Sequence, residues 1–268
     1  MDPTAILQPQ QQIEESFVYA GQCPQAVASP EAEAAMGATP DERGYYRSRF
    51  DGKLYAKVYV RGTGTFSDGT PMTLGEKRYF QVQPIAWYPY FLSEDKGILV
   101  SRHVLFTCPF DDSSNEWGTS YVRKELQNFA LACLDARTKA RITDLVLDND
   151  SLGQETVLDG RSVVLSADNA PWCVQPLTWD GVFLFSRPEI EGMQSPSRPF
   201  SPTDYARAMG AVATPDGLGT GWLRTADATA TRAATFGFDQ IASLVLPDTG
   251  REVTDELGVL PVLSVTMP

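Results

Sequence analysis

The chain ends in Gly258-Val259-Leu260-Pro261-Val262-Leu263-Ser264-Val265, a nearly unbroken run of aliphatic residues. Short apolar runs rich in β-branched residues favour a buried strand over a helix. The run therefore predicts a closing strand over Val259–Val265. Working back from it, two more strands are expected at Thr235–Phe238 and Ser243–Leu246, because Gly, Asp and Pro separate these short segments.

The first half of the chain shows the same strand pattern. Tyr45–Phe50 and Lys53–Val60 alternate apolar and charged residues on either side of Asp51-Gly52. An Asp-Gly pair between two alternating segments is a strong hairpin signal, so a hairpin is expected here. Three further strands are expected at Tyr79–Val82, Ile85–Leu92 and Ile98–Ser101.

Helices are fewer than strands in the predicted structure. Between Thr119 and Leu134 the apolar residues recur at three- and four-residue spacing, which predicts a helix with one buried face; they are Val122, Leu126, Phe129, Ala130 and Cys133. A short second helix is expected from Ser201, a candidate cap followed by Pro202, to a stop at Gly210. One medium helix and one short helix among many strands predict an α+β fold.

The N-terminal residues 1–43 differ from the rest of the chain in composition. They contain seven acidic residues and one basic residue, together with Gln-rich and Ala/Pro-rich runs. Such segments offer little apolar surface to bury, so an acidic arm is expected at 1–43, either solvated or ordered against a partner or a second copy. The main domain is then expected at 44–268, with an entry hairpin region at 44–83 and the body at 84–268.

Charge and composition restrict the classes of partner. The 268 residues carry 22 basic and 34 acidic side chains, a formal charge of −12. A surface this acidic repels phosphate backbones, so nucleic acid is not expected as a partner. No apolar run reaches the length of a membrane span, and the first residues do not resemble a signal peptide. These features predict a protein without membrane insertion, which is cytoplasmic or virion-associated unless it is exported by another route.

The cysteines do not form a metal-binding pattern. Cys23, Cys108, Cys133 and Cys173 are widely separated, and His103 is the single histidine of the chain. Zinc sites need closely spaced Cys and His ligands, so no metal and no cofactor are expected. Cys133 lies on the apolar face of the predicted helix and is interpreted as a reduced core residue.

Several short motifs resemble, in their order, the bacterial domain-of-unknown-function family 6273. They are Pro84-Ile85-Ala86-Trp87, Gly97–Leu105, Ser114–Leu126, Asp180–Ile190, Pro202–Ala206, Trp222-Leu223-Arg224-Thr225 and Gly258–Leu263. The likeness covers about residues 44–268. The chain departs from the family at Leu260-Pro261, where Arg-Pro is usual, and at Glu125-Leu126-Gln127, where Trp-Leu-Asn is usual.

This resemblance implies a C-type-lectin-like architecture, of the kind shared with formylglycine-generating enzymes and variable phage binding proteins. In such a fold the N- and C-terminal strands pair, so the segment near Trp87 and the tail near Leu263 are expected to be neighbours in one sheet. The resemblance further implies long irregular loops between about residues 211 and 258, forming one exposed face. Function must still be argued from the site itself.

Catalytic patterns are weak in this sequence. The oxidase chemistry of formylglycine-generating enzymes needs two late cysteines, and no cysteine follows Cys173. A Ser–His–Asp set would have to use His103, which lies in an apolar strand and is interpreted as structural. No spacing singles out a pair of carboxylates for hydrolysis, although a carboxylate-dependent hydrolase remains an alternative.

Three loops resemble ligand-binding motifs only in part. Gly62–Gly69 is glycine-rich but lacks the Gly-Lys-Ser/Thr ending of a phosphate loop, and no helix pattern follows it. Gly217–Trp222 lacks both the preceding strand and the following helix of a nucleotide loop, so both segments are interpreted as turns. Asp148–Asp159 resembles a calcium loop, yet leucine occupies one ligand position and no glutamate closes it. A solvated acidic turn is the simpler interpretation of that segment.

The candidate site residues fall into two groups. The ligand-binding candidates are loop residues, Trp172, Asp216, Asp227, Arg232, Asp239 and Arg251. The structural candidates are Trp87, Trp117, Trp222 and Arg224. Arg224 is expected to donate to carbonyls or to a carboxylate such as Asp180. Trp172 and, less strongly, Trp179 are aromatic side chains able to stack on a sugar or anchor a protein interface.

The sequence thus predicts a non-enzymatic binding or adhesion module that recognises a protein or a glycan through exposed loops. The alternative from another class is a structural virion or surface-assembly protein, in which residues 1–43 dock on a neighbouring subunit to form a homo-oligomer. A hydrolase acting through carboxylates is the third hypothesis.

Overall fold

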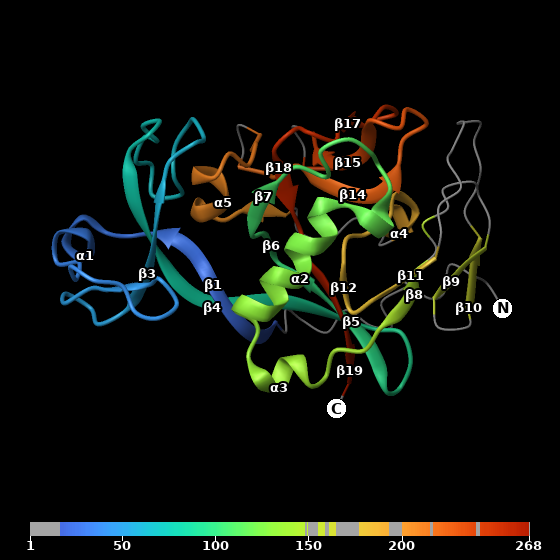
Figure 1. Ribbon diagram of the computed structural model, residues 1–268, viewed down its shortest axis with the longest axis horizontal. Coiled ribbons are helices and arrows are strands. Elements are labelled where there is room, and N and C mark those ends of the chain that lie inside the picture. Colours follow the sequence, from blue (N-terminus) through green and yellow to red (C-terminus); the bar gives the residue numbers. More distant parts are fainter. Residues whose placement is uncertain are drawn as a thin grey trace.

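The computed structural model describes residues 17–147, 149, 177–192, 200–214, 217–239 and 242–267, together with the backbone of 155–158 and 161–164. These residues form a seven-stranded and a six-stranded β-sheet, three two-stranded sheets and a few helices, and the two large sheets share one main apolar core (Figure 1). The predicted α+β class is confirmed. No helix in the described part of the chain is long and apolar enough to cross a membrane.

The larger sheet has seven strands in the described residues. Its order is β12 (Val182–Phe183), β19 (Val262–Thr266), β5 (Lys96–Ser101), β4 (Lys77–Phe91), β3 (Leu54–Tyr59) and β2 (Tyr46–Arg47), with β1 (Val18–Val27) also paired to β4. Strands β2 and β3 form the predicted hairpin, in which Tyr46 pairs with Tyr55. Gly52 takes a φ of 73° in its turn, a left-handed conformation that glycine adopts without strain.

Strand β4 is one continuous strand where two separate strands were expected. The segments Tyr79–Val82 and Ile85–Leu92 are continuous through Pro84, which has no N–H to donate to a neighbouring strand. Strand β1 accommodates the proline with a register shift between Tyr19 and Gln22, after which Gln22 pairs with Pro84. Gly21 lies in this shift at a φ of 71°, and a Cβ there would come within 2.5 Å of the Cys133 carbonyl oxygen.

The predicted boundary at residue 43 is wrong. Strand β1 pairs with the middle of β4 and buries Ala20 and Cys23 in the main core. The short helix α1 (Pro30–Ala34) buries Ala32 against Tyr55 and Tyr79 of the large sheet. Residues 17–43 therefore belong to the folded body despite their acidic composition, and residues 1–16 lie outside the described part.

The expected pairing of the terminal strands is also wrong. Trp87 of β4 pairs with Ser101 of β5, and Leu263 of β19 pairs with Leu99 of the same β5. Strand β5 thus lies between the two segments that were expected to be neighbours. The first strand, β1, pairs with β4 and makes no pairing with β19.

The second sheet has six strands in the described residues. Its order is β16 (Leu244–Val245), β15 (Arg232–Phe238), β14 (Gly221–Ala226), β18 (Leu257–Val259) and β7 (Phe106–Cys108), with β17 (Arg251–Glu252) also paired to β15. Strand β14 is buried along its whole length. Residues 211–258, expected to be mainly loops, therefore supply most of this sheet.

The closing apolar run forms two strands in different sheets. It changes sheets at Leu260-Pro261, because proline cannot donate a ladder hydrogen bond. The chain segment from β5 to β7 also passes from one sheet to the other, and it runs beside the segment from β18 to β19. The Ser101 N–H donates to the Pro261 carbonyl at 3.0 Å and the Leu105 N–H to that of Val259 at 3.1 Å, so a two-strand ribbon joins both sheets.

Helix α2 (Tyr121–Cys133) confirms the predicted helix and lies across the region where the sheets meet (Figure 1). Ser120 caps it by accepting from the Arg123 N–H at 3.3 Å. Its apolar face is buried, and the ring of Phe129 stacks on Phe106 of β7 at 5.7 Å. Helix α2 thereby attaches to the second sheet.

The second predicted helix begins later than expected. Helix α5 (Asp204–Ala208) is capped by Thr203, whose hydroxyl accepts from the Ala206 N–H. Ser201 and Pro202 instead form β13, which pairs in parallel with β6 (His103–Val104). Gly210 follows the helix at a φ of 112°, as the predicted stop requires.

Three buried tryptophans tie distant segments together. The indole N–H of Trp87 donates to the Ala20 carbonyl at 2.8 Å, that of Trp222 to the Cys108 carbonyl at 2.9 Å, and that of Trp117 to the Asp180 carboxylate at 3.0 Å. All three rings are fully buried. A buried indole needs such a partner, so their predicted structural placement fits the geometry.

Candidate functional site

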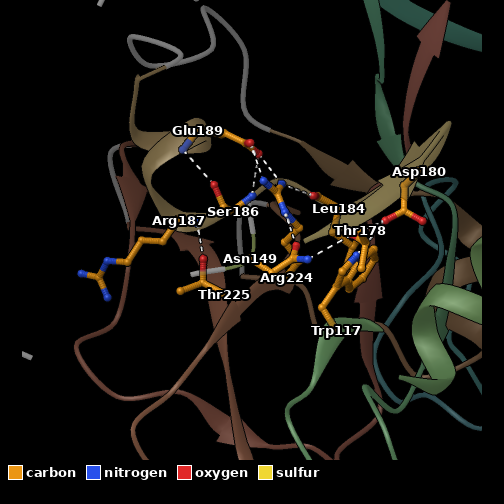
Figure 2. A network of polar contacts seen from close by, with 10 residues as sticks. All are labelled: Trp117, Asn149, Thr178, Asp180, Leu184, Ser186, Arg187, Glu189, Arg224 and Thr225. Carbon is orange, nitrogen blue, oxygen red and sulfur yellow. Dashed lines mark hydrogen bonds and ion pairs between the residues drawn. The ribbon is translucent and has the colours of Figure 1, made fainter. Parts of the chain in front are cut away.

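A chain of polar side chains, most of them buried, connects several elements around β14 (Figure 2). We call it the polar network, and its members are Trp117, Arg123, Asn149, Thr178, Asp180, Glu189 and Arg224. They come from the 3₁₀ helix η2 (Trp117–Thr119), α2, β11 (Thr178–Asp180), helix α4 (Arg187–Gly192) and β14, and Asn149 comes from the segment that follows β8 (Leu145–Leu147).

Arg224 lies at one end of the network and is fully buried. Its guanidinium makes two hydrogen bonds to the Glu189 carboxylate and a third to the Leu184 carbonyl at 2.8 Å. A guanidinium presents a planar fork of donors that matches a carboxylate, which makes this bidentate geometry the strong form of an ion pair. The predicted structural donor is therefore present, but its carboxylate partner is Glu189 rather than Asp180.

Glu189 is held in place by the start of α4. Its carboxylate accepts from the Ser186 backbone N–H at 2.8 Å, and the Ser186 hydroxyl accepts from the Glu189 N–H at 3.4 Å. This reciprocal arrangement is a capping box, for which Ser186-Arg187-Pro188-Glu189 has the right spacing. The Ser-x-x-Glu pattern was the one sequence signal that could have identified Glu189.

Asp180 lies at the other end of the network. Its carboxylate accepts from the Arg123 guanidinium at 2.7 Å, from the Trp117 indole at 3.0 Å and from the Thr178 hydroxyl at 2.7 Å. Arg123 also donates to the Gly118 carbonyl at 2.7 Å. The arrangement joins η2, α2 and β11 through one buried carboxylate.

Asn149 connects the two ends. Its amide N–H donates to the Thr178 hydroxyl at 3.0 Å, and its amide oxygen accepts from Arg224 at 3.2 Å. Asn149 belongs to the segment that partly resembles a calcium loop, but its side chain points into the network. Asp148, Asp150 and Asp159 of that segment lie outside the described residues.

The network contains two acids and two bases, each paired with its opposite. Of the four buried charged side chains of the described residues, Asp204 alone lies outside these pairs. Its carboxylate accepts from the Ser67 N–H and hydroxyl, both at 2.7 Å, and from the Val27 N–H at 3.1 Å. Each of these carboxylates has its buried oxygens satisfied by donors from the protein. The geometry is that of a framework that fixes element positions.

The predicted ligand-binding residues make local contacts at the ends of β15. Arg232 pairs with Glu252 at 2.6 Å, and Arg251 pairs with Asp255 at 3.1 Å. Asp227 accepts from the Gly250 N–H at 2.6 Å, which places it beside Arg232 and Arg251. These three candidates are therefore brought together at one end of β15.

Asp239 does not join this group. It follows Phe238 at the opposite end of β15 and accepts from the Ser243 N–H at 2.8 Å within a tight turn. Trp172 and Asp216 lie outside the described residues. The candidates therefore do not form one common site in the described part of the chain.

His103 lies in β6 and is half-buried. Its Nδ1 is 3.0 Å from the Ser201 hydroxyl and 3.2 Å from the Ser201 carbonyl. Burial is the main cause that lowers the pKa of His103 from its ordinary value. The hydrogen bond with Ser201 raises the pKa by less than burial lowers it, and the charge of Arg102 lowers it slightly further. The imidazole is thus favoured in its neutral form between two strands.

The described cysteines are unpaired thiols. Burial raises the pKa of Cys23 and Cys108, and it raises that of Cys133 to about 11. A protonated thiol is a poor nucleophile and a poor metal ligand. Within the described residues no three His, Cys, Asp or Glu side chains gather in a way that could hold a metal ion. Cys173 lies outside them.

An exposed tryptophan lies directly on the outer surface of the network. Trp179 is 62% exposed in β11, between the buried Thr178 and Asp180. Strand alternation points its side chain outward while its two neighbours point into the network. Val146 of β8 (Leu145–Leu147) pairs with Trp179, and Leu177 beside it is 50% exposed.

Comparison of the chain with models of protein families, with curated proteins and with solved structures finds no match.

Proposed function

We propose that this protein is a non-enzymatic binding module for a protein or a glycan. The observation that carries the proposal is that all four buried charged side chains of the described residues, Asp180, Glu189, Asp204 and Arg224, are engaged by internal partners. Catalytic carboxylates are typically held in environments that shift their affinity for protons and leave them open to substrate. A fully paired framework instead supports recognition at its surface.

Trp179 is the residue we assign to that recognition. A rigid aromatic side chain exposed on a strand offers a large contact area at a small cost in conformational entropy. Its two flanking residues are fixed in the polar network, so the ring is presented from a well-supported backbone. This surface replaces the face at residues 211–258 as the main recognition candidate.

The proposal includes the resemblance of the chain to family 6273. A helix after the early strands, a late Trp-Leu-Arg strand and a closing apolar segment occur in the order that a C-type-lectin-like domain of family 6273 would have. Residues 222–224 lie in β14, at the centre of the second sheet. The described strands lack the pairing of first and last strands that such a domain would have, so the proposed binding role rests on the site geometry.

The test is a binding screen of the full chain against glycan and bacterial surface-protein arrays, followed by affinity measurements with Trp179→Ala. We expect the variant to bind at least about tenfold more weakly, as for a central aromatic contact. Leu131→Ala is the matched control, because Leu131 is 71% exposed on α2 and also loses a large apolar side chain. Equal affinity of Trp179→Ala and the unaltered protein would refute the assignment.

A further inference from the structure

Strand β3 lies at the end of the molecule opposite β11 (Figure 1), and one face of the large sheet there carries lysine and tyrosine residues. We call it the lysine–tyrosine face, and it consists of Tyr46, Lys57, Tyr59, Lys77 and Tyr79. The register of the strands places them on one side, since Lys57 pairs with Tyr79 and Tyr59 pairs with Lys77. Directly paired residues of antiparallel strands project to the same face.

Contacts between these side chains fix the lysines. The Lys57 ammonium lies 4.7 Å from the centroid of the Tyr46 ring, and the Lys77 ammonium lies 5.9 Å from that of Tyr79. The Tyr46 and Tyr79 rings meet edge to face at 5.5 Å. Helix α1 covers Tyr79 on one side, which leaves Lys57, Lys77 and the 63% exposed Tyr59 projecting beyond it.

Nearby acids balance the charge of this face only in part. Neither Lys57 nor Lys77 forms a salt bridge within 4.0 Å of a described acid. The two acids close to the face, Glu33 and Glu76, are paired with Arg78 at 3.3 and 3.9 Å, and the charge of Lys77 also acts on Glu33. As diagonal neighbours on paired strands, the two lysines have Cα atoms about 7–8 Å apart.

The strands that carry this face are basic although the whole chain is acidic, while the segment 28–43, which packs beside them, carries four acidic and one basic side chain. Residues 44–83 contain seven basic and three acidic side chains, whereas the chain carries a formal charge of −12. Salt screens charges beyond about 8 Å at physiological ionic strength, so a ligand on this face responds mainly to the local lysines. The face is therefore suited to an anion.

We propose that the lysine–tyrosine face binds an acidic polysaccharide, through Lys57 and Lys77 to its carboxylate or sulfate groups and through Tyr59 to a sugar ring. A sugar ring offers an apolar face to an aromatic side chain as well as its acidic substituent, so one uronic acid residue satisfies both kinds of group. An acidic peptide would use the lysines and leave the Tyr59 ring without a comparable partner. The proposal shares no residue with the Trp179 surface and is independent of it.

The experiment measures binding of the full chain to immobilised polygalacturonate, heparin and neutral dextran. We expect binding to at least one of the acidic polymers and none to dextran, with affinity falling as salt rises. Lys57→Gln/Lys77→Gln should lower the affinity at least about tenfold, and Tyr59→Ser should lower it by a smaller factor. Lys124→Gln/Arg137→Gln is the matched control, because it removes two exposed positive charges, one from α2 and one from helix α3 (Ala136–Lys139). This variant should retain the affinity within about twofold.

Thermal unfolding of each variant verifies that the fold is intact before its affinity is compared. Binding to neither acidic polymer would overturn the proposal, as would equal losses in the two double variants, which would indicate only the general charge of the protein. Binding to immobilised polyglutamate tests whether the face prefers an acidic peptide. If it binds as tightly as the polysaccharides and Tyr59→Ser has no effect, the face is a site for acidic peptides and the polysaccharide assignment is wrong.

Discussion

Two Arg–Glu pairs lie on adjacent strands of the second sheet and differ in burial. Arg224 of β14 and Glu189 have side chains that are 0% and 6% exposed, whereas Arg232 of β15 and Glu252 are 42% and 46% exposed. The residue types are the same in both pairs. In the buried pair each charge depends on its partner, while in the exposed pair water can solvate either charge alone.

The difference separates framework from surface in this molecule. The Arg224 side chain donates to the Leu184 carbonyl and to Asn149 as well as to Glu189, so its replacement removes contacts with three residues at once. The Arg232 side chain donates to Glu252 of the neighbouring β17. The Arg232 position was a candidate for ligand binding and Arg224 a candidate for structure, and burial gives a physical reason to expect different responses to substitution.

Glu189→Gln is expected to have the largest effect. The amide oxygen can still accept from the Ser186 N–H, but the Arg224 guanidinium is left as a buried charge without a counter-charge. Removing one partner of a buried pair costs about 3–5 kcal/mol. Chemical denaturation of the variant should show this loss in the free energy of unfolding, and a loss below about 1 kcal/mol would place the pair among the weak surface pairs.

Asp180→Asn should have an intermediate effect, because Arg123 is partly exposed and water can solvate its charge. One oxygen remains to accept from the Trp117 indole, so the main change is the lost charge in the contact with Arg123. Hydrogen bonds to charged groups contribute about 1.5–3 kcal/mol, and the unfolding free energy should fall by that amount. If Asp180→Asn lost more unfolding free energy than Glu189→Gln, the Asp180 end of the network would contribute more to stability than the Arg224 end, contrary to this prediction.

His103→Gln should alter how stability depends on pH. The pKa of His103 is lowered in the fold, so protonation favours the unfolded chain as pH falls below the ordinary value of about 6.5. Its contribution to stability is present above that pH and is lost between about 6.5 and the lower folded pKa. The unfolding free energy measured from pH 8 to 5 should decline less in His103→Gln than in the unaltered protein. Identical declines would show that burial does not keep this imidazole neutral.

Glu252→Gln should have the smallest effect. Both side chains of the Arg232–Glu252 pair are accessible to water, and salt screens their attraction. The melting temperature of the variant should match that of the unaltered protein within the error of the measurement, in both low and high salt. A resolved decrease that disappears in high salt would show that exposure does not weaken this pair as argued.

Local patterns predicted the parts of the fold that depend on neighbouring residues. The hairpin around Asp51-Gly52 follows from turn chemistry, and α2 follows from its apolar spacing. Burial of Trp87, Trp117 and Trp222 follows from their size and apolar surroundings. Each of these features is decided within about a dozen residues of sequence.

Features that depend on distant residues were not predictable in this way. The partner of Arg224 is 35 positions away, and Asp180, the expected partner, is taken by Arg123 instead. The acidic composition of residues 1–43 concealed β1, because its pairing with β4 is made by backbone groups that composition does not report. The change of sheet at Pro261 is visible only once both neighbouring strands are placed.

The central claim is that the Arg224–Glu189 pair holds the framework together. A double-mutant cycle with Arg224→Met and Glu189→Gln, measured by chemical denaturation, tests it most directly. Each single variant should lose about 3–5 kcal/mol, and the double variant should lose clearly less than the sum, because no buried charge remains unpaired. Losses that simply add would contradict the account, since they would show that the two side chains stabilise the protein independently.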